Sequence, residues 1–214
     1  MKPFLWDYWR SSAAYRVRAA LNLKGIAYDA RQVDLTKGDQ RSPANLSRHP
    51  QGLVPALEID GLTLVQSLPI IEYLDETRPD VRLIPEDPVA RQRARAIACA
   101  VAMEIHPVCN LSVARYASGL AGIEMGDWMR AFIPKGLAAV EEMLTDGRSG
   151  QRAGAFGQGE APGLIDCVLM PQIYNARRWE VDLSDMPTIL RIEENCAALD
   201  AFRRAHPDAV GAPA

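Results

Sequence analysis

Two adjacent serines stand where the sequence changes from a strand pattern to a helix pattern. Residues 4–8 are a short apolar and aromatic run, and Ser11 and Ser12 precede a helical pattern that ends before Gly25. Hydroxyl groups at a helix N-terminus lie beside free backbone N–H groups and the positive end of the helix dipole. A thiolate bound there would be stabilised, which lowers the pKa of its thiol. Simple capping of the helix by serine is the alternative interpretation.

Two further short motifs offer backbone groups to a ligand. Val54-Pro55 comes directly before a predicted strand, where a cis proline would leave the backbone N–H and C=O of Val54 free to pair with an extended peptide. Gln66-Ser67 opens a helix directly after a strand, and amide N–H groups at that position bind carboxylates. An edge-strand proline and a plain helix cap are the alternatives. Together the three motifs predict a site for a small peptide that carries a thiol and a carboxylate.

The elements that must position these motifs form a βαβ unit followed by a ββα unit. The predicted strands are residues 4–8, 28–35, 56–59 and 62–65, and the predicted helices are residues 13–24 and 67–76. The last two strands are expected to form a tight hairpin, because Asp60-Gly61 supplies the positive φ angles of its turn. Ser67 is expected to cap the second helix, with Pro69 in its first turn. This order predicts a mixed four-stranded sheet.

The remainder of the chain carries only helical patterns. Asp87-Pro88 opens this region as an N-cap followed by proline at the first helical position. His106-Pro107 is expected to bend the first helix. The predicted helices are residues 88–117, 124–145, 164–179 and 187–204. The predicted domains are an α/β domain at residues 1–80, a linker at 81–87 and an all-helical domain at 88–214.

The composition argues against several classes of protein. The net charge is −3 over 214 residues, which does not indicate a nucleic-acid partner. No apolar run approaches about 18 residues, and the N-terminus does not resemble a signal peptide, so a cytoplasmic protein without a membrane partner is expected. The cysteines show no Cys-x-x-Cys pair and no metal-ligand spacing, so we expect buried thiols and no metal site. They are Cys99, Cys109, Cys167 and Cys196.

Longer motifs carry a family resemblance. Residues 9–25, from Trp-Arg-Ser-Ser-Ala-Ala-Tyr-Arg-Val-Arg to Lys-Gly, resemble the signature of zeta-class glutathione transferases, in which Ser-Ser-Cys precedes an Arg-Val-Arg helix. That class includes the maleylacetoacetate and maleylpyruvate isomerases. Further matches are residues 50–61, residues 66–74, Ile105-His-Pro, Asn110-Leu, Pro171-Gln and residues 176–183. The resemblance therefore extends over about residues 3 to 205.

The resemblance implies a thioredoxin-like first domain, an all-helical second domain, a homodimer and glutathione as the cofactor. It implies that Ser11 and Ser12 hydrogen-bond the glutathione sulfur, and that the backbone of Val54, ahead of Pro55, pairs with the cysteinyl unit. The other implied contacts are Gln66 and Ser67 at the γ-glutamyl carboxylate, Gln51 nearby, and His106 and Asn110 toward the glycyl end or the substrate.

Four positions depart from the family pattern. Ala13 replaces the cysteine that follows the two serines, and Ala14 replaces the next serine. The nucleophile is the thiol of glutathione itself, so the change at Ala13 is expected to affect substrate positioning and rate and not to abolish the reaction. His49 replaces the asparagine before the proline of the middle motif. Gly163 replaces a threonine three residues before Asp166; glycine is a tolerable N-cap, so some stability is expected to be lost and function kept.

The activity implied by the resemblance is the isomerisation of a maleyl diketo acid, maleylacetoacetate or maleylpyruvate, to its fumaryl isomer. A thiolate that adds to the cis double bond leaves a single bond, which rotates before elimination restores the alkene. Arg10 and Arg178 are the candidates for the carboxylates of a small dicarboxylate substrate, because arginine pairs with carboxylates bidentately. His106 is a candidate for proton transfer, and a packing residue at the helix kink before Pro107 is the alternative. For Arg177 and Arg178 a solvated helix face is the alternative.

Two other functions stay open. A general glutathione transferase or peroxidase that acts on haloacids or other electrophiles would use the same site without two carboxylate-binding arginines. A non-catalytic binding module could keep the same fold, although the presence of all three motifs argues against this interpretation. A thioredoxin-type oxidoreductase is disfavoured because no cysteine precedes Cys99.

Overall fold

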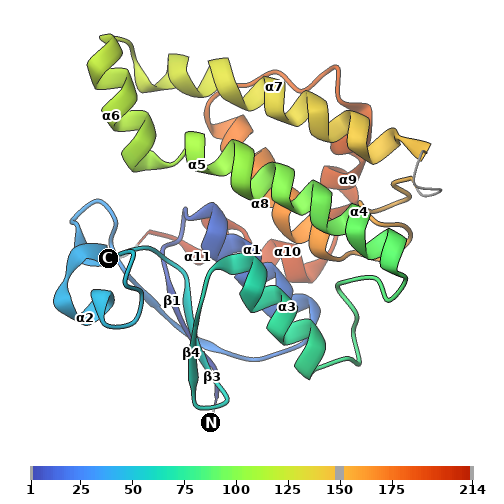
Figure 1. The fold of residues 1–214 in the computed structure, drawn as a ribbon, viewed down its shortest axis with the longest axis horizontal. Coiled ribbons are helices and arrows are strands. Elements are labelled where there is room, and N and C mark those ends of the chain that lie inside the picture. Colours follow the sequence, from blue (N-terminus) through green and yellow to red (C-terminus); the bar gives the residue numbers. More distant parts are fainter. Residues whose placement is uncertain (1, 148–151, 213–214) are drawn as a thin grey trace. The chain divides into compact units, whose positions relative to one another are not determined.

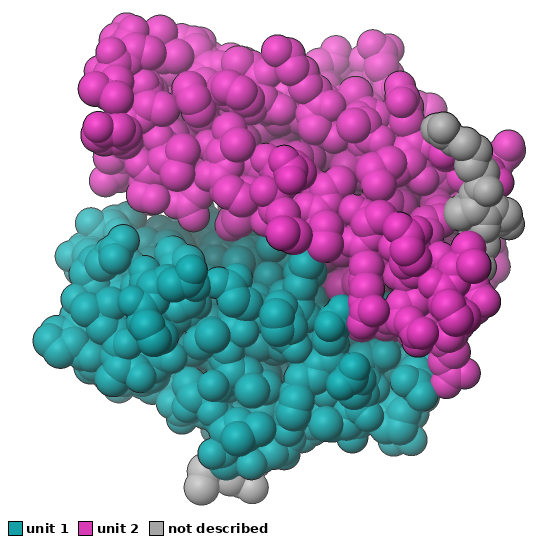
Figure 2. All heavy atoms as spheres, in the orientation of Figure 1, with its two compact units in different colours: residues 1–83, 198–214 teal, residues 84–197 magenta. Residues whose placement is uncertain are grey.

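The computed structural model describes residues 2–147 and 152–212, and the contacts within the chain divide it into two compact units (Figures 1 and 2). The first unit comprises residues 1–83 and 198–214, and the second comprises residues 84–197. The C-terminal residues, which the sequence assigned to the helical domain, therefore group with the first unit.

The first unit contains the mixed four-stranded sheet. Its strands are β1 (Phe4–Asp7), β2 (Asp29–Gln32), β3 (Ala56–Ile59) and β4 (Leu62–Val65), in the order β2-β1-β3-β4. β1 and β2 are parallel, whereas β3 is antiparallel to both β1 and β4. β2 is shorter than predicted, because Asp34 accepts hydrogen bonds from the backbone N–H and the hydroxyl of Thr36 and turns the chain out of the strand.

The predicted hairpin between β3 and β4 is confirmed. Ile59 faces Leu62 across the turn, and the two intervening residues have positive φ angles, 55° at Asp60 and 79° at Gly61. These angles suit a two-residue loop whose twist matches that of the flanking strands.

Three helical segments follow β1, β2 and β4 in the first unit. α1 (Ser12–Leu23) is buried around its whole circumference from Ala14 to Leu21. The polar stretch after β2 forms a short 3-10 turn, Asp39–Arg41, and α2 (Pro43–Leu46). α3 (Ser67–Thr77) packs against α1. The N-cap of α3 is Gln66, with Ser67 as its first residue, so the prediction that Ser67 is the cap was wrong by one position.

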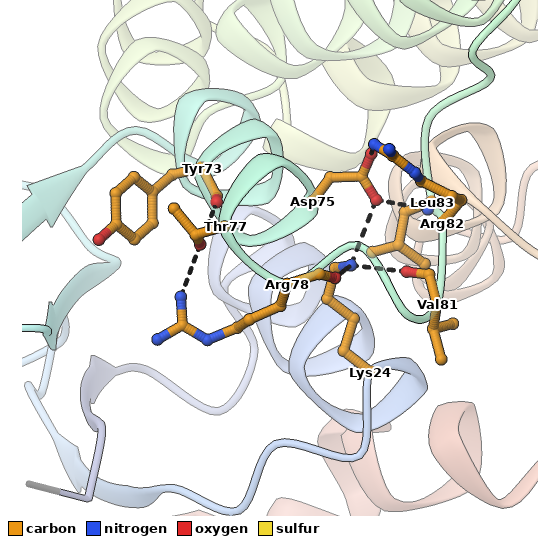
Figure 3. Close-up of polar contacts among 8 residues, drawn as sticks. All are labelled: Lys24, Tyr73, Asp75, Thr77, Arg78, Val81, Arg82 and Leu83. Carbon is orange, nitrogen blue, oxygen red and sulfur yellow. Dashed lines mark hydrogen bonds and ion pairs between the residues drawn. The ribbon is translucent and has the colours of Figure 1, made fainter.

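The segment after α3 is held against α1 and α3 by hydrogen bonds around a buried ion pair, shown in Figure 3. Lys24, at the end of α1, pairs with Asp75 of α3 at 3.2 Å and donates to the carbonyl oxygen of Val81 at 2.6 Å. Asp75 also accepts a hydrogen bond from the backbone N–H of Leu83 at 2.6 Å. The chain as far as Leu83 is therefore hydrogen-bonded to side chains of α1 and α3.

The second unit contains helices and no named strand among the residues that the structure describes, apart from an isolated β-bridge between Phe156 and Gly159. The helices are α4 (Pro88–Cys99), η2 (Ala100–Ile105), α5 (His106–Val108), α6 (Leu111–Ala121), α7 (Met125–Thr145), α8 (Leu164–Arg178) and α9 (Pro187–Ala197). α8 is the central element, because most of its residues are buried and it contacts α4, α7 and α9. Asp87 caps α4 as predicted, accepting from the backbone N–H of Ala90 at 2.8 Å.

The predicted helix at 88–117 is interrupted rather than only bent at Pro107. Proline has no N–H and its ring crowds the carbonyl four residues earlier, which an α-helix cannot accommodate without distortion. The distortion takes the form of a π-helix, η2, whose wider turns lie just before Pro107. Asn110 then starts α6, which is inclined by 45° to the preceding helical segment. No single helix in the described ranges is long and apolar enough to span a membrane, although this bent pair passes the same length and composition criteria together.

The predicted helix at 187–204 is two helices. α9 ends at Ala197, and α10 (Asp200–Ala205) begins after Leu199, whose backbone is extended. No proline or glycine marks this break, so the local sequence carried no signal for it. α10 contacts α1 of the first unit, and α11 (Pro207–Val210) follows α10.

Candidate functional site

The register of the sheet brings the three predicted motifs to one edge. Trp6 near the end of β1 is opposite Ala56 at the start of β3, and Ala56 is opposite Val65 at the end of β4. The segments that follow β1, precede β3 and follow β4 therefore leave the sheet side by side. These segments carry Ser11-Ser12, Val54-Pro55 and Gln66-Ser67 respectively.

Ser11 is the N-cap of α1. Its side chain accepts a hydrogen bond from the backbone N–H of Ala14 at 3.1 Å, and its backbone is extended, as a capping residue requires. This leaves the hydroxyl proton of Ser11 available to donate to a ligand. Ser12 is the first helical residue, and both serines are partly exposed. The structure places both hydroxyls at the positive end of a twelve-residue helix.

Val54 and Pro55 are joined by a cis peptide bond. The side chain of Val54 packs with Tyr8 and Val33 in a small apolar cluster, which fixes its backbone beside the end of β1. Within the described residues, neither the N–H nor the C=O of Val54 makes a hydrogen bond. These two groups can therefore pair with an extended peptide, as the sequence suggested.

Gln66 has an unusual backbone conformation at the start of α3. Its φ of 69° lies in the left-handed region, where residues other than glycine are strained. Its side-chain amide donates to the side-chain oxygen of Gln51 at 2.6 Å, so the two glutamines form one polar group at the surface. Ser67 beside it is buried. This arrangement directs the free N–H groups at the start of α3 and a serine hydroxyl to one place, which suits a carboxylate.

Arg16 is a residue near this group that the sequence reasoning missed. It lies on α1, is 2% exposed and donates from Nη1 to the Ser67 hydroxyl oxygen at 3.2 Å. Burial lowers the pKa of Arg16 to about 10. The abundance of arginine in this chain concealed it, and the Arg-Val-Arg motif was the one signal that could have drawn attention to it.

Arg10 is exposed, and its guanidinium group lies over the ring of Trp9 at 4.1 Å. Such stacking restricts a flexible side chain while leaving its hydrogen-bond donors accessible. The structure thus places Arg10 one residue before the N-cap of α1, next to the serine hydroxyls in sequence.

The other predicted site residues belong to the second unit. His106 is the first residue of α5, and Asn110 caps α6 by accepting from the backbone N–H and the hydroxyl of Ser112. Arg178 is the exposed last residue of α8 and lies over the Trp179 ring at 4.9 Å. Arg177 beside it pairs with Glu193 of α9 at 2.7 Å, so the solvated-face interpretation fits Arg177.

The structure locates three of the positions that depart from the family pattern. Ala13 is the second residue of α1 and is half-buried. His49 is buried, and burial lowers its pKa. Gly163 is the N-cap of α8 and has no side chain to accept a hydrogen bond, but Asp166 accepts from the Gly163 N–H at 2.8 Å. Half of the usual reciprocal capping arrangement is therefore kept.

Two of the four cysteines are poor sources of thiolate. Burial raises the pKa of Cys109 to about 11, and burial together with Asp166 raises that of Cys196 further. Cys167 is also buried, whereas Cys99 is only half-buried, contrary to the prediction that all four are buried. All four cysteines belong to the second unit, whereas Ser11 and Ser12 belong to the first.

Comparison with known proteins decides the family. Residues 10–77 match the family model for the glutathione S-transferase N-terminal domain. The maleylacetoacetate isomerase of Rhizobium meliloti (strain 1021) is 55% identical over 207 residues, which cover 95% of each chain. This chain belongs to the zeta-class glutathione transferase and maleylacetoacetate isomerase family.

Solved structures of zeta-class relatives agree with this assignment. The holo structure of a bacterial zeta-class maleylpyruvate isomerase has a TM-score of 0.91 at 39% identity, covering 96% of this chain and 97% of the other. Maleylacetoacetate isomerase from Anaeromyxobacter dehalogenans 2CP-1, with dicarboxyethyl glutathione and citrate in its active site, has a TM-score of 0.85 at 45% identity, covering 97% and 92%. The chain therefore has the glutathione-transferase fold, with a thioredoxin-like βαβαββα unit and a helical unit.

Proposed function

We propose that this chain is a glutathione-dependent isomerase that converts a maleyl diketo acid, maleylacetoacetate or maleylpyruvate, to its fumaryl isomer. The observation that carries the proposal is the convergence of the Ser11 hydroxyl, the unpaired Val54 backbone and the N-terminus of α3 at one edge of the sheet. The family supports the same activity, since a relative with 55% identity is a maleylacetoacetate isomerase.

The residues of the first unit fit glutathione as cofactor. The unpaired N–H and C=O of Val54 match the backbone of a cysteinyl residue, and they would otherwise remain without partners. Gln66, Ser67 and Gln51 would hold the γ-glutamyl unit at the start of α3, where the helix dipole favours a carboxylate. When bound, glutathione supplies the thiol whose reversible addition to the cis alkene allows the carbon–carbon bond to rotate.

Ser11 and Ser12 would lower the pKa of the cofactor thiol. A hydroxyl donor at the N-terminus of α1 favours the charged form of a nearby sulfur through the hydrogen bond and the helix dipole. The capping bond from Ala14 also fixes the position of the Ser11 oxygen. Ala13 cannot donate a hydrogen bond, so the two serines must provide this effect in this chain.

The substrate carboxylates would be held by arginine. We assign Arg10 and Arg178 to this role, because both are exposed and both are restricted by stacking on a neighbouring tryptophan. His106 is assigned to proton transfer at the carbon where negative charge develops, and Asn110 to the glycyl end of the cofactor or the substrate. Since the Asn110 oxygen is already occupied by Ser112, its amide N–H₂ would be the group that donates.

A homodimer in the cytoplasm is part of the same proposal. The cytosol is a compartment where glutathione keeps thiols reduced, which suits four cysteines that form no disulfide. The family resemblance supports the dimer, and size-exclusion chromatography with light scattering would test it.

The decisive experiment follows the absorbance of maleylacetone with purified protein, in the presence and absence of glutathione. Glutathione-dependent loss of absorbance, reduced at least about tenfold in Arg178→Ala and little changed in the matched variant Arg177→Ala, is the expected result. Binding of glutathione without turnover would refute the isomerase and favour a transferase with another electrophile. Failure to bind glutathione would instead favour a binding module with the same fold.

A further inference from the structure

Arg16 has an incomplete set of hydrogen bonds in a fully buried position. Its Nη1 donates to the Ser67 hydroxyl oxygen at 3.2 Å, but Nε and Nη2 have no acceptor among the described residues. No carboxylate in the described part of the chain forms an ion pair with it. Burial alone accounts for the lowering of its pKa, with no opposing negative charge. The free energy cost of such an unpaired buried charge is considerable.

Arg18, on the same helix, is a buried arginine whose charge and hydrogen bonds are satisfied within the chain. It is 1% exposed, pairs with Asp7 at 2.7 Å, and donates to the carbonyl oxygens of Trp9 and Ala205 at 3.0 and 2.9 Å. α1 thus carries two buried guanidinium groups two residues apart, of which one is balanced within the chain and the other is not. The unbalanced one is the arginine that contacts Ser67.

The contact with Arg16 determines what the Ser67 hydroxyl can do. Arginine has no acceptor atom, so Arg16 must be the donor and the Ser67 oxygen the acceptor. The hydroxyl proton of Ser67 is then directed away from Arg16 and is available for an acceptor at the start of α3. A donor polarised by a cation, beside free helix N–H groups, is suited to a carboxylate.

We infer that Arg16 is a positioning residue for the carboxylate of the γ-glutamyl unit of glutathione. It holds the Ser67 hydroxyl as a donor and supplies the positive charge that the bound carboxylate balances. The inference rests on the proposed function, because it takes glutathione as the ligand at this site. It also explains why α1 keeps a buried charge that the free protein leaves without an ion-pair partner.

The test measures affinity by titration calorimetry with two probes, glutathione and 4-aminobutyryl-cysteinylglycine, which lacks the γ-glutamyl carboxylate. Arg16→Met is expected to weaken glutathione binding by about tenfold or more, and to change the affinity for the second probe by less than about twofold. Ser67→Ala should show the same selectivity. The matched control is Arg93→Met, a buried arginine of the second unit that donates to the Leu144 carbonyl oxygen; its glutathione affinity should stay within about twofold.

Thermal unfolding without ligand separates a positioning role from a structural one. Arg16→Met should be as stable as the wild type or more stable, because it removes an unpaired buried charge, whereas Arg18→Met should be less stable. Loss of ligand-free stability in Arg16→Met, with equal weakening for both probes, would overturn the inference. Failure of both Arg16→Met and Arg16→Gln to fold would also overturn it.

The outcomes also separate this inference from the proposed function. Wild-type protein that binds no glutathione would contradict the proposed function and this inference together. Wild-type binding that is weakened by Ser67→Ala but unchanged by Arg16→Met would leave the proposed site in place and remove only the role of Arg16.

Discussion

At the scale of single residues, the Ser11 hydroxyl has two roles. Its oxygen accepts the Ala14 N–H and caps α1, and its proton is free for a ligand. Ser11→Ala should therefore lose about 1 kcal/mol of unfolding free energy together with most of the glutathione-dependent turnover. Ser11→Asp should keep the cap and the stability but lose turnover, because a carboxylate repels a thiolate. Urea denaturation and the maleylacetone assay measure the two effects separately.

Ser12→Ala is the matched control for the stability of these variants. Ser12 is the first helical residue and makes no capping bond among the described residues, so its replacement should change stability little. Retained turnover in Ser11→Asp would contradict the role of Ser11 beside the thiol and would leave that role to Ser12 alone.

Residue identities were predictable where a local rule connects sequence to geometry. A serine at a strand-to-helix turn, a proline opening a strand and a helix start after a strand are all local patterns, and the structure brings Ser11, Val54 and Ser67 to one edge of the sheet. Arg16 was not predictable in this way. Whether an arginine on an amphipathic helix is solvated or buried depends on what covers α1, and that is a property of the tertiary structure.

At the scale of elements, the start of α8 depends on one buried carboxylate. Asp166 accepts from the backbone N–H groups of Gly157 and Gly163, each at 2.8 Å, and is completely buried. Desolvation raises its pKa from 3.8 to about 6 despite these two donors. Its protonated form is thus favoured in the folded state, so the stability it contributes is fully present below about pH 4 and is lost as pH rises through 6.

Asp166→Asn tests this pH dependence, because asparagine does not titrate. The unfolding free energy of the wild type minus that of Asp166→Asn should fall by roughly 2 kcal/mol between pH 4 and pH 7. Denaturant titrations of both proteins over this range measure the difference, and the other titrating groups cancel. A difference that rises with pH would show that the two N–H donors outweigh desolvation and keep the carboxylate ionised.

The contact between α7 and η2 depends on the absence of a side chain at Gly136. A Cβ at this position would lie 2.6 Å from Cδ1 of Ile105, and closer still to Cγ1, and Ile105 is buried. Gly136→Ala should therefore lower the unfolding free energy by about 1 kcal/mol or more, since overpacking exceeds the gain in helix propensity. Thermal or urea unfolding measures this change.

Two further variants test the cause. Ile105→Ala combined with Gly136→Ala should be destabilised by less than the sum of the single changes, because the new methyl group fills part of the cavity. Gly119→Ala in α6 is the control, because a Cβ there meets nothing within 4 Å and the helix should gain up to about 1 kcal/mol. If the losses of unfolding free energy in Gly136→Ala and Ile105→Ala simply add in the double variant, the proposed steric clash between the two side chains is contradicted.

The ends of helices and strands were predictable where capping or turn residues mark them. They were missed where tertiary packing determines where an element ends. Asp60-Gly61 fixed the hairpin and Asp87-Pro88 fixed the start of α4, since both are local signals. The break at Leu199 has no such signal, and it separates α9, which packs within the second unit, from α10, which packs on α1. Competing tertiary contacts of the two segments account for the difference.

At the scale of the whole molecule, the chain returns to its first unit at the end. Phe202 of α10 is buried, and the carbonyl oxygens of Ala201 and Ala205 accept hydrogen bonds from Asn22 and Arg18 of α1, both at 2.9 Å. Hydrophobic patterns in residues 1–80 could not reveal this, because they show which face of α1 is apolar and not which distant segment covers it. α10 is thus a structural part of the glutathione-binding unit.

Truncation tests this dependence directly. A chain that ends at Ala197 lacks α10, so it should expose the apolar surface that Phe202 covers and leave the Arg18 and Asn22 donors without their acceptors. We expect it to lose glutathione binding and the cooperative unfolding of the first unit, because buried donors without partners and an uncovered helix act together. A chain that ends at Val210 keeps α10 and α11 and should bind glutathione like the full chain. Near-native glutathione affinity in the shorter chain, measured by titration calorimetry, would show that the sheet, α1 and α3 fold without α10, and would make the sequence-based boundary at residue 80 the better description.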